Sequence, residues 1–264
     1  MSSSSDEHEV NDEDELLMHN EFTLPDNCKK YWKKRYDLFS KFDNGVYMTS
    51  ELWFSVTPEP VAKFTSQFVR ELLPRATTIV DLCCGGGGNT IQFASTFDSV
   101  GAIDINPVNV KCTMHNANIY GVHDKIWPVT GDWNQISQNG GKDWIPSDVS
   151  QIDLMFCSPP WGGPKYSKND NEFDLLDMSP FPLEKLLLQM SQYSRNLAVF
   201  LPRSLNLDQL RSVTKKLFGA QAKCRVVYLY LRNHCPGLIA FFGEEVASQY
   251  VVYTEDIVGE DYYG

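Results

Sequence analysis

Thr77-Thr-Ile-Val-Asp-Leu-Cys-Cys-Gly-Gly-Gly-Gly-Asn-Thr90 is the stretch of this sequence that decides its fold. A β-branched run leads to a carboxylate at Asp81, and four glycines follow, from Gly85 to Gly88. A glycine-rich turn between a strand and a helix lets a ligand approach the backbone closely, as in nucleotide-binding α/β proteins. The stretch therefore predicts the first strand, loop and helix of a nucleotide-binding sheet.

The chain beyond this stretch alternates short apolar runs with amphipathic segments, which is typical of a parallel sheet covered on both faces. The predicted strands are 77–83, 98–104, 126–129, 152–157, 195–201, 224–231 and 238–243. The predicted helices are 89–96, 107–120, 182–193 and 207–218. No helix separates the last two strands, so they are expected to form an antiparallel hairpin. The expected fold class is α/β, with a doubly wound, seven-stranded sheet.

Charge divides the chain into a nearly neutral body and two acidic ends. The 264 residues carry a formal net charge of −11. Of the 34 acidic residues, nine lie in 1–27 and four in 255–264, which leaves 21 acidic against 23 basic residues in 28–254. We expect a disordered acidic tail over 1–27, a helical extension over 28–75, the sheet domain over 76–246 and an acidic tail over 247–264.

The N-terminal extension has its own pattern. Trp32, Tyr36 and Phe39 recur at helical spacing opposite four lysines, which predicts an amphipathic helix over 28–42 with a basic face. The basic face is a candidate for phosphate contact. A second helix is predicted over 59–73, starting at Thr57-Pro58.

Several classes of protein are disfavoured. The sequence has no run of about 18 apolar residues and no signal-peptide core, so a soluble, intracellular protein without membrane contact is expected. Its seven cysteines are odd in number and show no C-x-x-C spacing, which favours neither a disulfide framework nor a zinc module. No metal site is predicted.

Two acids indicate the ligand of the glycine loop. Asp104 ends the second predicted strand 23 residues after Asp81, where an acid can bind ribose hydroxyls. Asp81 would repel a pyrophosphate but attract the ammonium and sulfonium of S-adenosylmethionine, which favours that cofactor. Asp132, beside Trp133 after the third strand, is a candidate for the adenine amino group, although it could equally be an ordinary loop residue.

The reacting group is suggested by Ser158-Pro-Pro-Trp161 after the fourth strand. An exocyclic nitrogen of a nucleobase is a poor nucleophile, so its hydrogens must be held by acceptors while it faces the methyl group. The Ser158 hydroxyl and a carbonyl of the stiff Pro159-Pro160 turn can accept those hydrogen bonds, and Trp161 can stack on the base. Ser158, Pro159 and Trp161 are therefore the candidate catalytic residues of an amino methyltransferase.

Five motifs together resemble the trimethylguanosine synthase family, and in particular its fungal members. They are Lys30-Tyr-Trp, Trp53-Phe-Ser-Val-Thr-Pro-Glu59, Cys84-Gly-Gly-Gly-Gly-Asn-Thr-Ile-Gln-Phe93, Ser158-Pro-Pro-Trp-Gly-Gly-Pro164 and Phe200-Leu-Pro-Arg203. The resemblance implies a class I S-adenosylmethionine-dependent methyltransferase fold with an α-helical N-terminal extension. It also implies methylation, twice, of N2 of the 7-methylguanosine cap of small nuclear and nucleolar RNAs, with N7 methylated first.

The resemblance further implies site residues, partners and location. The implied cofactor-binding residues are Phe39, Thr57, Asp81, Cys84, Gly85, Asn89, Thr90, Asp104, Ile105, Asp132, Trp133 and Ser158. The implied cap-binding residues are Lys30, Pro160, Trp161, Tyr166, Arg203 and Asn233. Capped small RNA and small ribonucleoprotein core proteins are the expected partners of a nuclear or nucleolar monomer.

Two other functions are alternatives to this interpretation. An amino methyltransferase for an internal RNA or DNA base would use Asp81, Asp104 and Ser158 in the same way. A cap-binding scaffold of small ribonucleoproteins with a degenerate cofactor pocket would need neither acid. Methyl transfer to a free cap analogue would argue against the first alternative, because an enzyme for an internal base would show none. Cap binding without cofactor binding would favour the second.

Overall fold

The computed structural model describes residues 16–161, 172–248 and 256–257. Its strands are β1 (Thr78–Leu82), β2 (Ser99–Asp104), β3 (Ile126–Thr130), β4 (Leu154–Cys157), β5 (Leu197–Leu201), β6 (Cys224–Leu231), β7 (His234–Phe242) and β8 (Asp256–Ile257). Its longer helices are α4 (Glu59–Leu72), α5 (Gly88–Thr96), α6 (Pro107–Tyr120), α8 (Leu183–Met190) and α9 (Leu207–Phe218). Four-residue helices are α1 (Lys29–Trp32), α2 (Arg35–Leu38), α3 (Leu52–Ser55), α7 (Trp133–Ile136) and α10 (Glu244–Ala247).

The sheet has the order β3-β2-β1-β4-β5-β7-β6-β8. Strands β1 to β5 run parallel, whereas β7 is antiparallel to both β5 and β6. The predicted α/β class, the doubly wound order and the terminal hairpin are confirmed. The sequence did not predict β8. This short strand lies inside the segment expected to be an acidic tail, and it pairs with β6.

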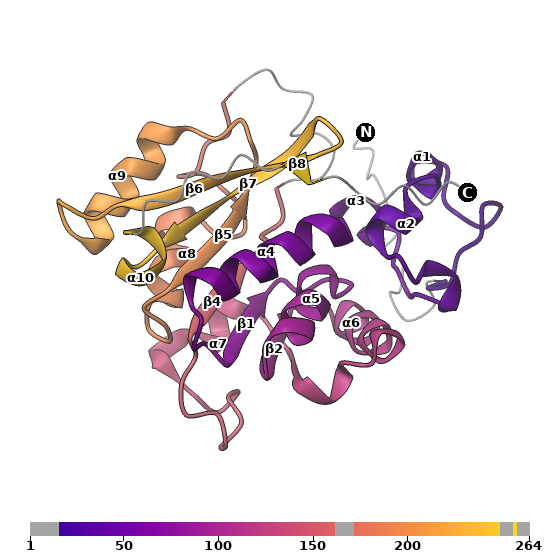
Figure 1. Ribbon diagram of the computed structural model, residues 1–264, viewed down its shortest axis with the longest axis horizontal. Coiled ribbons are helices and arrows are strands. Elements are labelled where there is room, and N and C mark those ends of the chain that lie inside the picture. The colour runs from indigo at the N-terminus through magenta and orange to yellow at the C-terminus, as the bar shows by residue number, and fades with distance from the viewer. Residues whose placement is uncertain (1–15, 162–171, 249–255, 258–264) are drawn as a thin grey trace, which may run out of the picture.

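Both faces of the sheet are buried, because alternate side chains along a strand pack against different helices. Ile79 belongs to a cluster with residues of α4, α5 and α6, whereas its neighbours Val80 and Leu82 belong to a cluster with residues of α8 and α9. Successive strand residues point to opposite faces, so a continuous apolar run is needed where helices cover both. Figure 1 shows α4 and α5 in front of the strands and α8 behind them. Within the described ranges, no helix is long and apolar enough to cross a membrane.

Strand register brings the candidate site residues to one edge of the sheet. Leu82 pairs with Ile103 on one side and with Cys157 on the other. The residues that follow, Cys83 and Ser158, therefore emerge beside Asp104, where the sheet order reverses around β1. Ligands of open α/β sheets bind at such a switch point.

The N-terminal extension differs from its predicted structure. The single helix predicted over 28–42 is wrong, because the chain forms only the short α1 and α2 and then an extended residue, Phe39 (φ −143°, ψ 113°). Its aromatic residues pack in different directions: Trp32 contacts Phe42 and Trp53, whereas Phe39 faces Tyr120. A helix this short is marginal by itself, so tertiary contacts decide its path.

The ordered part of the chain was expected to begin at Cys28, but it begins earlier. Leu24 is buried, and the carbonyl of Leu17 accepts a hydrogen bond from the Met48 N–H at 2.9 Å. Residues 16–27 therefore pack on the extension despite their acidic composition, because the apolar Leu17 and Leu24 join its core.

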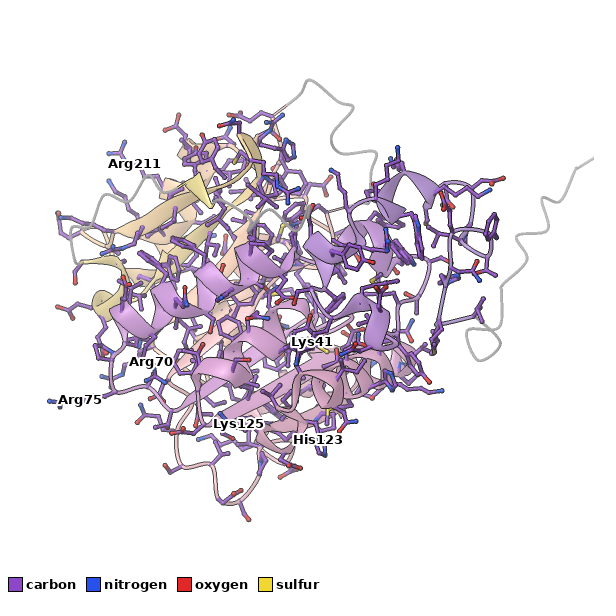
Figure 2. All side chains as sticks on the ribbon, turned by 45° about the vertical axis from the view of Figure 1, so that its right-hand side comes forward. Lys41, Arg70, Arg75, His123, Lys125 and Arg211 are labelled. Atoms are coloured by element: carbon purple, nitrogen blue, oxygen red, sulfur yellow. The ribbon has the colours of Figure 1, made fainter. Side chains whose placement is uncertain are left out.

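Two cations stabilise the carboxyl end of α5, the helix that starts at the glycine loop (Figure 2). The Arg70 guanidinium donates to the Thr96 carbonyl at 2.7 Å, and Lys125 Nζ donates to the carbonyls of Ala94 and Phe97 at 3.0 and 3.2 Å. Positive groups at this end complement the helix dipole and bind carbonyls that lack helical partners. They help to hold the helix whose other end faces the candidate site.

We expect Gly88→Ala to destabilise the protein. A Cβ atom at Gly88 would lie 2.9 Å from the Thr57 carbonyl oxygen, so this glycine serves the close approach of the extension to α5. Overpacking of this kind costs about 1–3 kcal/mol of unfolding free energy. Urea denaturation would measure the loss, with Gly121→Ala as a comparison, because that glycine has open space around it and only its positive φ to strain. Equal stability of Gly88→Ala and the wild type would contradict the close packing.

Candidate active site

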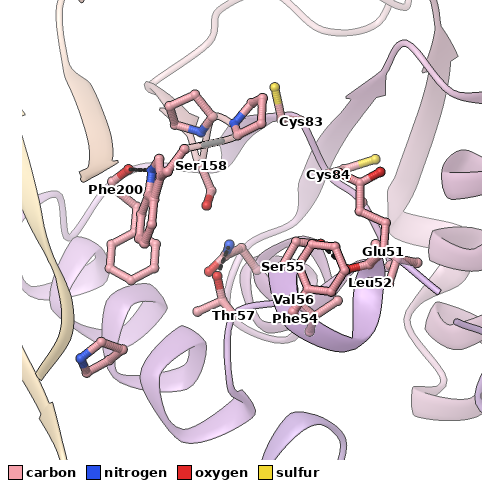
Figure 3. A pocket seen from close by; sticks show the side chains of 18 of the residues that line it. Glu51, Leu52, Phe54, Ser55, Val56, Thr57, Cys83, Cys84, Ser158 and Phe200 are labelled. Carbon is pink, nitrogen blue, oxygen red and sulfur yellow. Dashed lines mark hydrogen bonds between the residues drawn. The ribbon is translucent and has the colours of Figure 1, made fainter. Parts of the chain in front are cut away.

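One large cavity, of about 1340 Å³, opens at the carboxyl edge of the sheet. Figure 3 shows residues of the 51–57 segment of the extension on one side and Ser158 and Cys83 on the other, and the glycine loop also lines the cavity. The β6–β7 hairpin and the end of β5 contribute Arg232 and Arg203. This volume exceeds that of a site for one ligand of drug size, which is about 300–1,000 Å³. The cavity can therefore hold a nucleoside cofactor and a nucleotide substrate together.

The glycine loop has the backbone that its sequence predicts. Gly85 and Gly87 have φ of 55° and 88°, a region that favours glycine. Cys83 also has a positive φ, of 61°, although it carries a side chain. Strain at a residue on a cavity wall is typical of ligand sites.

Asp104 anchors this loop. Its carboxylate accepts hydrogen bonds from the Gly85 N–H at 2.9 Å, the Asn106 N–H at 2.9 Å and the Asn109 side chain at 3.3 Å. Burial raises its pKa, and the two backbone donors act in the opposite direction. Asp104 thus lines the cavity and also fixes the loop.

Asp81 is buried at the end of β1 and does not line the cavity. One carboxylate oxygen accepts a 2.5 Å hydrogen bond from the Thr90 hydroxyl, whereas Oδ1 has no partner among the described residues. Burial raises the Asp81 pKa to about 7. A nearby cation would favour the ionised form of this carboxyl.

The adenine ring is proposed to bind at the end of the cavity where α7 begins. Apolar side chains also line the cavity there. Asp132 caps α7 by accepting a hydrogen bond from the Asn134 N–H at 2.9 Å. This bond gives Asp132 a structural role, in agreement with the alternative that it is an ordinary loop residue. Trp133 is buried against Trp144 and Tyr193, and it also reaches the cavity wall. Ile105 leaves 67% of its surface exposed on the same wall. An exposed aliphatic side chain here can pack against an adenine ring.

Ser158 to Trp161 lie on the opposite side of the glycine loop. The Ser158 N–H donates to the Leu82 carbonyl at 3.4 Å, which continues the pairing of β4 with β1. Trp161 donates from Nε1 to the Phe200 carbonyl at 3.2 Å. Its indole also packs edge to face on the Phe200 ring, with 5.2 Å between the ring centroids. These contacts fix the orientation of an indole that is only partly buried and lines the cavity.

A bidentate ion pair joins the extension to the hairpin. The Arg232 guanidinium contacts the Asp37 carboxylate at 2.9 and 3.1 Å, and both residues line the cavity. Lys30 lines the extension side, and Arg203 lies at the end of β5. This rim offers cations for an anionic substrate. Sequence analysis missed Asp37 and Arg232, because nothing in a pattern pairs residues 195 positions apart.

The cavity brings together most of the predicted site residues, whose roles stay predictions. On its wall are Lys30, Thr57, Cys84, Gly85, Asn89, Asp104, Ile105, Asp132, Trp133, Ser158, Pro159, Pro160, Trp161 and Arg203. Among the described residues, Phe39, Asp81, Thr90 and Asn233 are not on the wall. Tyr166 lies outside the described residues.

The residues off the wall have local reasons for their positions. Phe39 is 2% exposed and is replaced on the wall by its neighbour Leu38. Asn233 occupies a left-handed position (φ 63°) in the β6–β7 turn, and its neighbours Arg232 and His234 line the cavity instead. The Thr90 hydroxyl donates a hydrogen bond to the Asp81 carboxylate beside the loop.

Unpartnered polar atoms give an independent test of the cofactor. Asp81 Oδ1, Asn89 Oδ1 and Trp133 Nε1 are buried without a hydrogen-bond partner among the described residues. Such atoms are costly unless a ligand or water satisfies them. Asn89 and Trp133 line the cavity, and Asp81 is hydrogen-bonded to Thr90, the residue next to Asn89, so the residues present fit S-adenosylmethionine.

A doubly wound sheet, a glycine loop anchored by an acid and Ser158-Pro-Pro-Trp161 at its switch point define a class I S-adenosylmethionine-dependent methyltransferase. Residues 76–245 match the family described as RNA cap guanine-N2 methyltransferase. The chain belongs to this family.

Two yeast proteins are similar over most of the chain. The trimethylguanosine synthase of Saccharomyces cerevisiae is 43% identical over 217 residues, which cover 81% of this chain and 67% of that protein. The trimethylguanosine synthase of Schizosaccharomyces pombe is 34% identical over 236 residues, which cover 84% and 95%. These similarities support the resemblance to fungal members.

Two solved structures share the fold. A human methyltransferase 10 domain-containing protein has a TM-score of 0.55 at 13% identity, over 82% of this chain and 97% of that one. A methyltransferase from Agrobacterium tumefaciens has a TM-score of 0.51 at 13% identity, over 72% and 63%. At this identity the likeness concerns the fold alone.

Proposed function

We propose that this methyltransferase is a trimethylguanosine synthase, which methylates N2 of a 7-methylguanosine RNA cap twice. The observation that carries the proposal is the meeting of Ser158-Pro-Pro-Trp161 with the Asp104-anchored glycine loop in one cavity. Bound there, S-adenosylmethionine supplies a sulfonium methyl group. Asp104 is the residue proposed for its ribose, and Asn89 and Thr57, which hydrogen-bond each other at 3.0 Å, border the same pocket.

Ser158 is proposed to aim the attacking amine. No hydrogen bond among the described residues occupies its hydroxyl, so this oxygen is available to accept from the guanine N2 amine, as is the Pro159 carbonyl. The amine becomes more acidic once alkylated and can lose its proton to water, so no strong base is required. Positioning of this kind can supply about 7–11 kcal/mol of the barrier reduction.

Trp161 is proposed to select the 7-methylguanine. Methylation at N7 gives the base a positive charge, and an indole face attracts a cation by about 0.5–2 kcal/mol. Lys30 and Arg203 on the rim are proposed to contact the cap phosphates.

Asp81 gives this proposal a pH dependence. Its pKa of about 7 means that the carboxyl is neutral below that pH and ionised above it. Since the ionised form attracts the cationic cofactor, we expect the affinity for S-adenosylmethionine to rise as the pH increases through 7. In the absence of cofactor the sign is opposite, because a pKa raised on folding contributes stability at low pH that is lost as the pH approaches 7.

Calorimetric titration of the wild type and Asp81→Asn at several pH values measures this effect. The ratio of the two affinities should increase with pH, because titration of the cofactor itself affects both proteins equally. A ratio that is constant between about one pH unit below and one above the pKa would contradict the role of Asp81.

The direct test of the proposed function is transfer of a radiolabelled methyl group to capped and uncapped RNA. We expect label in the capped RNA and in a free 7-methylguanosine cap analogue, but not in uncapped RNA. An enzyme for internal bases would label uncapped RNA and leave the analogue unlabelled. Cap binding without cofactor binding would instead identify a scaffold.

The substrates are proposed to be small nuclear and nucleolar RNAs, and the place of action the nucleus, including the nucleolus. Small ribonucleoprotein core proteins are the proposed partners. The support for these assignments is membership of the cap-modifying family. Fluorescent tagging of the full chain would test the location, and a purely cytoplasmic signal would contradict it.

A further inference from the structure

Asn116 is a fully buried side chain that connects two separate parts of the molecule. It lies on α6 and is 0% exposed. Its Oδ1 accepts from the Tyr47 N–H at 2.8 Å, and its Nδ2 donates to the Tyr47 carbonyl at 2.9 Å. The same Nδ2 donates to the Gly86 carbonyl at 2.9 Å. One amide therefore binds both the N-terminal extension and the glycine loop.

The extension covers the glycine loop from the other side. Cβ atoms built at Gly85 and Gly86 would lie 3.1 Å from the Leu52 side chain, and one at Gly88 would lie 2.9 Å from the Thr57 carbonyl. The loop is thus enclosed between α6 and residues 52–57. Its shape depends on how the extension is docked.

Other hydrogen bonds dock other residues of the extension on α6 and do not involve the loop. The Tyr120 hydroxyl donates to Glu59 at 2.6 Å and accepts from the Lys41 N–H at 3.2 Å. Glu59 in turn accepts from the Ser40 N–H and hydroxyl, at 2.6 and 2.9 Å. These bonds provide a matched reference for Asn116, because they belong to the same interface and the same helix.

We propose that Asn116 is a positioning residue, which couples docking of the N-terminal extension to the conformation of the cofactor loop and thereby sets the affinity for S-adenosylmethionine. The inference rests on the proposed function of the loop as the cofactor site. Asparagine is suited to this role because its amide offers one acceptor and two donors, which match one N–H and two carbonyls.

Asn116→Asp tests the donors specifically. The carboxyl is nearly isosteric, but in its ionised form it presents only acceptors to the carbonyls of Tyr47 and Gly86. We expect the dissociation constant for S-adenosylmethionine to rise about tenfold at neutral pH, as the loss of buried hydrogen bonds implies. Asn116→Ala should show a similar rise.

The pH profile separates positioning from a general structural role. When protonated, the carboxyl introduced by Asn116→Asp can donate one hydrogen bond again, so the ratio of this variant's dissociation constant to that of the wild type should fall as the pH is lowered. The ratio for Asn116→Ala should not change with pH. His115, Cys84 and Asp104 are the other ionisable side chains of this region, and the ratio to the wild type removes any effect that they have equally on both proteins.

Tyr120→Phe is the matched control. It removes the hydroxyl that binds Glu59 and Lys41, and its melting temperature should fall, while its cofactor affinity should stay within about twofold, since the buried Leu38 and Trp53 still hold the extension. Equal cofactor affinity in the wild type, Asn116→Asp and Asn116→Ala would overturn the inference. Failure of the wild type to bind the cofactor would instead overturn the proposed function.

A measurement on the wild type covers the case in which the variants do not fold. Coupling is reciprocal, so cofactor binding should stabilise the docked extension. Amide hydrogen exchange at Tyr47, whose N–H donates to Asn116, should slow when S-adenosylmethionine is added. Unchanged exchange at Tyr47 in the presence of bound cofactor would contradict the coupling.

Discussion

Trp161→Ala is expected to reduce methyl transfer to roughly a hundredth or less, because stacking of a base on an aromatic ring contributes about 1–3 kcal/mol and the substitution also removes the surface that orients the base. Cofactor affinity should stay within about twofold, since Trp161 packs on Phe200 whereas the glycine loop and Asp104 are the residues proposed to bind the cofactor. Methyl transfer to capped RNA, and calorimetry with S-adenosylmethionine, measure the two effects.

Trp161→Phe is the control for this result. Phenylalanine keeps a ring but loses the bond from Nε1 to the Phe200 carbonyl, so the base can still stack on a less well oriented surface. We expect its activity to lie between those of the wild type and Trp161→Ala. Comparable activity in the wild type and Trp161→Ala would contradict the role assigned to the indole.

Asp104→Ala is expected to weaken cofactor binding by about a hundredfold. The substitution removes the proposed ribose ligand and also releases the Gly85 N–H, and hydrogen bonds to a charged group are worth about 1.5–3 kcal/mol each. The methyl-transfer rate at saturating cofactor should fall less than the affinity. Calorimetry and steady-state kinetics separate the two quantities.

Asp153→Ala is the matched comparison. Asp153 also accepts backbone hydrogen bonds, from Thr77 and Thr78 at 2.7 and 3.0 Å, but at the opposite end of β1. We expect this variant to lose stability while keeping its cofactor affinity. If the two aspartate variants weakened cofactor binding equally, the loss would reflect general instability and not the site.

Periodicity and turn residues predicted the sheet domain well. The helix over 107–120 and the strand over 224–231 match the structure residue for residue, because Pro107 and Gly121 mark the helix ends and the strand is an apolar and aromatic run interrupted only by Arg225. The strand predicted from residue 238 begins at His234, because pairing with β6 extends it beyond its apolar part.

The extension was less predictable. Its aromatic residues follow a helical spacing, yet Trp32 and Phe39 pack on different neighbours and the chain turns between them. The glycine loop, Asp104 and Ser158 could be found because each lies at the end of a strand or directly after it in the sequence. Arg232 and Asn116 could not, since each acts on residues far away in the chain and neither belongs to a motif.

The cap-specific assignment makes one measurement decisive: the mass of the cap after reaction of two RNAs of identical sequence, one with a 7-methylguanosine cap and one with an unmethylated guanosine cap. We expect two methyl groups on N2 of the 7-methylguanosine cap. Transfer to the unmethylated cap should be slower by about tenfold or more, because it lacks the charge that the Trp161 indole is proposed to attract. Equal transfer to both caps, or methylation within the RNA body, would contradict the cap-specific assignment.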